Sequence, residues 1–188
     1  MHDLVAQTAL GGQTARTEII GGLTIAEVPD IALASVAARL GQESTCAAAL
    51  KDMLGGPPPE VGRCFFGTPV DAFWTAQDQW MLMADHGTQE VLAAHVKDTL
   101  GSCASVTEQN DGWVCFDISG DKVVALFERL CPVAIHRMQK GDAQRTTLHH
   151  IGCFILCLEA GQSIRLLGPR SFAESLNHAL CVAARSLN

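Results

Sequence analysis

The chain has 188 residues, of which 48% are apolar and 5% are aromatic, and it carries a formal net charge of −7. This apolar content favours a packed globular domain over a disordered chain, and the scarcity of aromatic rings disfavours a surface that stacks on single-stranded nucleic acid. The 13 basic residues are scattered along the chain. We therefore expect no nucleic acid and no membrane among its partners.

The N-terminus and the cysteines both indicate a cytoplasmic protein. Residues 1–19 lack the basic start and apolar core of a secretory signal. The longest apolar run, 151–158, is far shorter than the roughly 20 residues that a membrane-spanning helix needs. The 8 cysteines form no C-x-x-C pair, which disfavours a thioredoxin-type site and a zinc ribbon. We expect them to be reduced and buried.

The first half of the chain is predicted to begin with a polar tail at 1–16 and to continue with strands and helices. Thr88 is the expected cap of its last helix, in which Leu92, Val96 and Leu100 share one face. The expected elements are strand material around a Gly-Gly turn at 18–28, a helix at 29–54 interrupted by Gly41, a Pro-rich loop at 55–62, strands at 63–67, 72–76 and 79–84, and a helix at 88–101.

The second half is predicted to contain a strand, a helix, three strands and a final helix. Ser171 and Glu174 have the S-x-x-E spacing of a capping box at the start of the last helix. Asp121 is expected to stabilise the start of the preceding helix through the helix dipole. The elements are a strand at 112–119, a helix at 120–131, strands at 145–150, 152–159 and 163–168, and a helix at 171–187.

The two halves repeat the same order of elements. Residues 25–40 align with 115–130, and residues 78–96 align with 161–180, each with a slippage of about one residue. The repeat predicts an α+β fold, because strands and helices occur in both halves without strict alternation.

The repeat also predicts how the chain is organised into domains. The two related halves, at about 17–101 and 105–188, are expected to pack around a shared core. Residues 17–188 then form a single two-halved globular domain, and 1–16 remain outside it as the N-terminal tail.

The stretch 147–158, TLHHIGCFILCL, contains two histidines and two cysteines and suggests a metal site. In a strand, His149, Cys153 and Cys157 are spaced by steps of about 13 Å. Ligands of one zinc lie within about 4 Å of each other. A buried core strand is therefore the favoured interpretation. The alternative left open is a zinc-dependent structural or redox protein in which a distant ligand joins His149 or His150.

No catalytic, cofactor-binding or metal site is assigned from the motifs. The sequence contains no G-x-S-x-G elbow, no Walker A motif and no G-x-G-x-x-G motif. Trp80 and Trp113 are candidate core or interface anchors, because large rings dominate buried contacts. Arg170 directly precedes the last predicted helix, where free N–H groups and an arginine favour an anion. These three residues are the possible interface or anion contacts.

Four motifs occur in order along the chain: FWTAQDQWMLMA at 73–84, T-x-Q-x-D-G-W at 107–113, LCP at 130–132 and PRSFAESL at 169–176. Together they resemble the gamma subunit of heterotetrameric bacterial sarcosine oxidase. The similarity covers residues 60–186 well and the first third loosely. A strand-helix unit at 119–130 is similar, more remotely, to the folate-binding aminomethyltransferases of the glycine cleavage system.

The resemblance implies an aminomethyltransferase-like fold and a non-catalytic role. It implies alpha, beta and delta subunits as partners in a complex that demethylates sarcosine to glycine, yielding hydrogen peroxide and either methylene-tetrahydrofolate or formaldehyde. FAD, FMN, NAD and tetrahydrofolate are implied for the whole complex, and no cofactor is expected on this chain.

The chain departs from the folate-using relatives at one position that matters. Those relatives carry an acidic residue in the strand that corresponds to Ile151, Gly152, Cys153 and Phe154, where this chain has no carboxylate. Folate chemistry is therefore not carried over to this chain. The alternative left open is a free-standing folate-type small-molecule binding protein or transferase with a pocket between the two halves.

Overall fold

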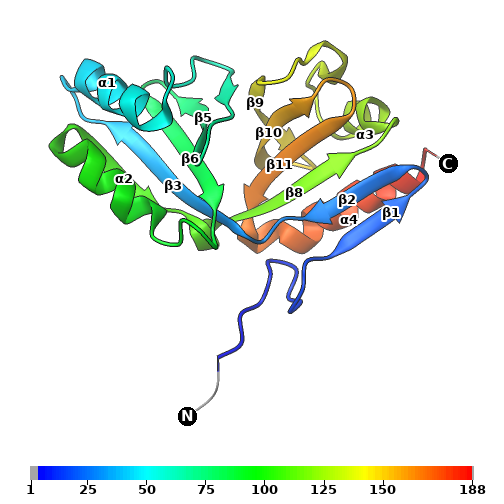
Figure 1. The fold of residues 1–188 in the computed structure, drawn as a ribbon. Helices are drawn as coiled ribbons and strands as arrows, with labels where there is room; N and C mark the ends of the chain where they lie inside the picture. Colours follow the sequence, from blue (N-terminus) through cyan, green and yellow to red (C-terminus); the bar gives the residue numbers. More distant parts are fainter. Residues whose placement is uncertain (1–3, 188) are drawn as a thin grey trace. The chain divides into compact units, whose positions relative to one another are not determined.

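The computed structural model describes residues 4–187. The chain forms two compact units, each with one sheet and its own helices (Figure 1). Among the described residues, the first unit contains 4–29, 111–140 and 144–187, and the second contains 30–110 and 141–143. No helix in this part of the chain is long and apolar enough to cross a membrane.

The first unit contains a six-stranded sheet in the order β1-β2-β8-β11-β10-β9. Helices α3 and α4 pack on one of its faces, and the apolar core of the unit lies there, because alternate residues of each strand point to that side. The strands are β1 (Thr17–Ile20), β2 (Leu23–Glu27), β8 (Trp113–Ser119), β9 (Ala143–Leu148), β10 (Ile151–Glu159) and β11 (Ser163–Pro169). The helices are η2 (Asn110–Gly112), α3 (Val123–Leu130), η3 (Ile135–Arg137), η4 (Arg170–Phe172) and α4 (Ala173–Arg185).

The second unit contains a five-stranded sheet in the order β4-β5-β6-β3-β7. Its core includes Leu50 of α1, Val96 of α2 and Leu82 of β6, none of which is exposed. The strands are β3 (Ile31–Ala38), β4 (Cys64–Phe65), β5 (Asp71–Ala76), β6 (Gln79–Asp85) and β7 (Ala104–Glu108). The helices are α1 (Glu43–Leu54), α2 (Leu92–Leu100) and η1 (Gly101–Cys103).

The two units share one order of elements, so the predicted repeat and the α+β class are confirmed. The chain runs β3-α1-β4-β5-β6-α2 in the second unit and β8-α3-β9-β10-β11-α4 in the first. The sheets also match, because β4-β5-β6-β3 and β9-β10-β11-β8 are adjacent in the same order. The fifth position is taken by β7 in one unit and by β2 in the other.

The predicted helix at 29–54 is wrong in its first part, where β3 lies. Ala-rich segments favour helix on intrinsic propensity. Here β3 pairs on one side with β6 and on the other with β7, and these two ladders outweigh that preference. The alignment of 25–40 with 115–130 is wrong for the same reason, because it placed β3 over α3. Strand β7 was not predicted.

The predicted helix caps are also wrong. Neither α3 nor α4 has a side-chain cap, and their N-cap residues are Lys122 and Phe172. The helix predicted from Thr88 begins only at Leu92, and the Thr88 N–H donates instead to the Asp85 carboxylate at 2.9 Å. The capping box at Ser171 does not form, because the chain makes the 3-10 turn η4 first. The predicted stop at Gly101 is confirmed.

The described part of the N-terminal segment lies on the first unit and is anchored by Glu27. The Glu27 carboxylate, in a residue that is 5% exposed, accepts the backbone N–H of Leu10 at 3.0 Å and that of Arg16 at 3.1 Å. Leu10 belongs to the apolar core of the unit. Arg170 donates to the Gln7 carbonyl at 2.9 Å and adds a second attachment.

The 8 cysteines are all free and buried, as expected. Burial raises the pKa of Cys46 to about 12 and the pKa of Cys153 to about 11, because a thiolate loses its hydration in the core. The ordinary value for these thiols is 9.0. These two thiols therefore bind their protons more tightly in the folded state than in the unfolded state.

We expect the protein to lose stability above about pH 9. A raised folded-state pKa contributes stability that is present below the unfolded pKa and lost as the pH rises through the folded pKa. At pH 10 the loss is about 1.4 kcal/mol for each such thiol. Urea unfolding at pH 7.5 and pH 10, compared between the wild type and Cys46→Ala, measures it. The variant is expected to have the smaller pH dependence, and equal pH dependence would contradict the assignment to Cys46.

Candidate functional site

The stretch that suggested a metal site is a hairpin rather than a single strand. Strand β9 ends at Leu148, and His149 and His150 form the two-residue turn with φ of 47° and 69°. Such hairpin turns need positive φ at both positions. Strand β10 then places Cys153 and Cys157 in the core of the first unit, with exposures of 1% and 0%. The strand predicted at 145–150 therefore has the right length but lies two residues too far along the chain, because β9 is Ala143–Leu148.

This geometry separates the histidines from the cysteines. No group of three or more His, Cys, Asp or Glu side chains among residues 4–187 is placed to hold a metal ion. The thiols of Cys153 and Cys131, both on the first unit, have raised pKa values, chiefly because of burial. A thiol with a raised pKa is a poor nucleophile at neutral pH, because the reactive form is the thiolate.

The three residues singled out from the sequence are divided between the two units. Trp80 belongs to the core of the second unit, is 7% exposed, and donates its indole N–H to the Pro59 carbonyl at 2.9 Å. Trp113 and Arg170 both belong to the first unit, where Trp113 begins β8 and is half-buried. The Trp113 ring lies 5.7 Å from that of Phe154.

Arg170 is already engaged by protein groups. Besides its bond to the Gln7 carbonyl, its guanidinium lies 3.7 Å from the Asp111 carboxylate. Asp111 is 92% exposed at its side chain, so this contact is a weak surface ion pair. An anion at Arg170 stays a prediction, and such an anion would compete with Asp111 for the guanidinium.

Asp117 forms a cross-strand ion pair with Arg165. Asp117 of β8 lies opposite Arg165 of β11 in the sheet. Two hydrogen bonds of 2.7 and 2.8 Å join the guanidinium to both carboxylate oxygens. The side chains are 30% and 17% exposed, so the pair is partly withdrawn from water. Bidentate geometry of this kind fixes the register of neighbouring strands.

Replacing Arg165 by methionine is expected to lower the free energy of unfolding by about 2 kcal/mol. The change leaves the Asp117 carboxylate without its partner, and the partial exposure keeps the loss below that of a fully buried pair. Urea unfolding of Arg165→Met, Asp117→Leu and the double variant measures the coupling. The double variant is expected to be more stable than the sum of the single losses predicts, and additive losses would rule out a stabilising pair.

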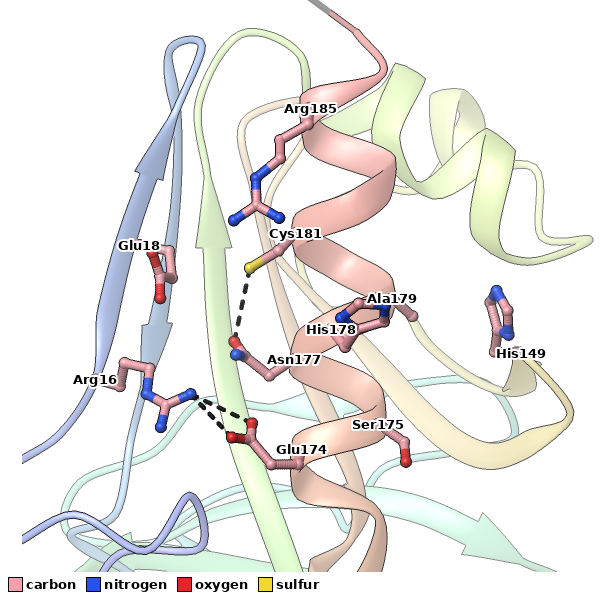
Figure 2. Close-up of a pocket in the computed structure, with 10 residues that line it drawn as sticks. All are labelled: Arg16, Glu18, His149, Glu174, Ser175, Asn177, His178, Ala179, Cys181 and Arg185. Carbon is pink, nitrogen blue, oxygen red and sulfur yellow. Dashed lines mark hydrogen bonds and ion pairs between the residues drawn. The ribbon is translucent and has the colours of Figure 1, made fainter.

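A groove of about 590 Å³ lies on the first unit between β1 and α4. Its floor includes Asn177 and Cys181, which are 7% and 4% exposed. Figure 2 shows the side chains of Glu18 and Arg185 pointing toward the space between β1 and α4. Burial raises the pKa of the Cys181 thiol, and Glu18 raises it further by charge repulsion.

Four charged side chains line this groove, those of Arg16, Glu18, Glu174 and Arg185, and two of them pair with each other. The Arg16 guanidinium donates to both oxygens of the Glu174 carboxylate at 3.2 Å (Figure 2). No ion pair or hydrogen bond of the Glu18 or Arg185 side chain is formed with another described residue. One negative and one positive group are therefore available to a molecule that binds along the groove.

Sequence reasoning missed this groove. One signal was present, since Glu174, Asn177, Cys181 and Arg185 recur at helical spacing along the last helix. The other wall could not be predicted. It comes from Arg16 and the strand after it, which lie more than 150 residues away in the chain.

Comparison with solved structures relates this fold to two proteins. No family model matches the chain, and no curated protein matches it. Heterotetrameric sarcosine oxidase from Corynebacterium sp. U-96, in complex with pyrrole 2-carboxylate, matches with a TM-score of 0.75 and 22% identity over 87% of this chain and 84% of that chain. Glycine cleavage system aminomethyltransferase T from Bartonella henselae matches with a TM-score of 0.61 and 14% identity over 85% of this chain and 48% of that chain.

The fraction of each chain that the match covers also shows how the lengths of the chains compare. The matched region is a similar share of this chain and of the sarcosine oxidase chain, so the two are close in length. The same region is about half of the aminomethyltransferase. The chain therefore has the α+β, aminomethyltransferase-like fold that the sequence predicts. Its length is similar to that of the matched chain in the sarcosine oxidase structure.

Proposed function

We propose that this chain is the non-catalytic gamma subunit of a cytoplasmic heterotetrameric sarcosine oxidase. In this assignment its partners are the alpha, beta and delta subunits, and the complex as a whole carries FAD, FMN, NAD and tetrahydrofolate. The complex demethylates sarcosine to glycine, and it produces hydrogen peroxide with methylene-tetrahydrofolate or formaldehyde. The observation that carries the proposal is the match in both fold and length to a chain of heterotetrameric sarcosine oxidase.

The chemistry of the described side chains supports a stabilising role. Burial raises the pKa of five cysteine thiols, and a raised pKa disfavours the reactive thiolate form. The strand that aligns with the folate-holding acid of the relatives has Gly152 and Cys153, and Cys153 points into the core. A catalytic role would need an activated group that could reach a substrate.

Co-expression of the larger subunits with and without this chain tests the proposal. We expect the yield of soluble, flavin-loaded complex to fall when the chain is omitted. Turnover of sarcosine per bound flavin in the remaining complex is expected to stay unchanged, because the chain supplies no reacting group. A turnover per flavin that falls to zero, with normal assembly, would contradict the non-catalytic role.

The second candidate is a free-standing folate-type binding protein or transferase. The structural similarity to aminomethyltransferase T favours it. Trp113 begins β8 and is half-buried, so its fluorescence can report a ligand bound to the first unit. Titration with tetrahydrofolate to about 1 mM discriminates the two candidates, since a specific site gives a saturable signal in this range. A linear response without saturation would exclude the second candidate.

A further inference from the structure

Strand β1 is one edge of the sheet in the first unit, and part of its backbone is unpaired. The carbonyl of Arg16 accepts the Glu27 N–H at 2.8 Å, which makes this the first hydrogen-bonded pair of the β1-β2 hairpin. Bonded and non-bonded pairs alternate in an antiparallel ladder. Glu18 therefore bonds to β2, whereas Thr17 and Ile19 direct their N–H and C=O groups away from it.

This edge has one charged side chain, Glu18, but lacks the lysine, proline or bulge that protects many exposed strands. Natural sheets shield their edges with lysine, proline, a bulge or a covering segment. The β1 sequence, TEII, contains no lysine or proline, and its register with β2 is regular. Ile19 is 78% exposed, so an apolar, β-branched side chain faces solvent beside the free backbone groups. The edge is therefore suited to accept another strand.

The groove between β1 and α4 continues this edge on the helix side of the sheet. Side chains of a strand alternate between the two faces, so every second side chain of an added strand would point toward α4. There it would meet Glu18 and Arg185, which have no ion-pair partner among the described residues. It would also meet Asn177, whose amide oxygen lies 3.9 Å from the Cys181 sulfur and whose amide nitrogen has no acceptor in residues 4–187.

We propose that β1 is a docking edge to which a larger subunit of the complex adds an extended segment as a seventh strand. The segment carries an acidic side chain toward Arg185 and a basic side chain toward Glu18, since these are the two free charges of the groove. Backbone hydrogen bonds to Thr17 and Ile19 supply the pairing, and the groove selects the side chains. The identity of the partner as a larger sarcosine oxidase subunit rests on the proposed function.

Capture from the native host with the full-length tagged chain tests this edge. Ile19→Pro removes an outward N–H that β2 does not use, and proline is tolerated at such edge positions. Ile19→Thr keeps the N–H and is the matched control. We expect Ile19→Pro to lower recovery of the larger subunits, identified by mass spectrometry, by about tenfold or more. Recovery with Ile19→Thr is expected to stay within about twofold of the wild type.

A charge variant keeps the test decisive if the proline variant fails to fold. Arg185→Glu is expected to lower recovery by about tenfold, and Arg39→Glu, an exposed arginine of the second unit, by less than about twofold. The docking edge is overturned if folded Ile19→Pro, or Arg185→Glu, recovers the larger subunits as well as the wild type does. It is also overturned if the chain forms a homodimer that is cross-linked through β1.

If the wild type instead captures other identified proteins, and both variants lose them, the docking edge is supported and the proposed function is overturned. A wild-type chain that captures nothing overturns both.

Discussion

Replacing Gly120 by alanine is expected to lower the free energy of unfolding by about 3 kcal/mol or more. Gly120 joins β8 to α3 and has a φ of +129°, which residues with a side chain rarely adopt. A Cβ there would also clash with the backbone carbonyl of Gly22, in the turn between β1 and β2. Urea unfolding of the variant measures the loss, and the fluorescence of Trp113 provides the signal.

Two other glycines separate the effect of the backbone strain from the effect of the clash with the Gly22 carbonyl. A Cβ at Gly161 meets no atom within 4 Å, and its φ is +68°, so Gly161→Ala isolates the backbone strain. Gly152 has neither a positive φ nor a neighbour within 4 Å, so Gly152→Ala is expected to change stability by less than about 1 kcal/mol. If Gly120→Ala costs no more than Gly161→Ala, the close approach of the β1-β2 turn is not what requires glycine.

Replacing Glu27 by alanine is expected to lower the free energy of unfolding by about 2–4 kcal/mol and to release the N-terminal segment. The change leaves the backbone N–H groups of Leu10 and Arg16 without their charged acceptor inside the unit. Hydrogen exchange read at single amides measures the release. We expect the amides of Leu10 and Arg16 to exchange faster, while amides of β10 change only as much as global stability does.

Two variants control this experiment. Glu27→Gln keeps an oxygen acceptor without the charge, so it is expected to be intermediate in both stability and exchange. Glu18→Ala removes a carboxylate that has no ion-pair partner in the described chain, and a change of less than about 0.5 kcal/mol is expected. Unchanged exchange at Leu10 in Glu27→Ala would show that the segment is held by its apolar contacts alone.

Most elements of this fold could be predicted from local patterns. The hairpin at the Gly-Gly pair, the strands that became β5, β6, β8, β10 and β11, and the helix ending at Gly101 all follow from alternation, helical spacing and turn residues. The repeat was visible for the same reason, since β6-α2 and β11-α4 carry similar patterns.

The misassigned segment shows what local patterns cannot supply. The sequence IALASVAA has the composition of a helix and becomes β3, because strands from both sides complete its hydrogen bonds. Those partners are β6 and β7, which lie about 40 or more residues later in the chain. Strand formation here depends on pairing across the sheet, and composition does not report it.

The candidate site was less predictable than the fold. Arg170 drew attention as an anion contact, but it holds the N-terminal segment and lies beside Asp111. Glu174 was expected to complete a capping box, and it pairs with Arg16 instead. The docking edge depends on which backbone groups β2 leaves free, and this follows from the register of the hairpin together with its hydrogen bonds.

Native mass spectrometry of the complex captured from the host is the direct test of the proposed assembly. We expect one copy of this chain bound to three different chains, together with the mass of bound flavin. The proposed assembly would be contradicted if the chain were recovered only as a monomer or as an oligomer of itself, under conditions in which the larger sarcosine oxidase subunits are present and assembled without it.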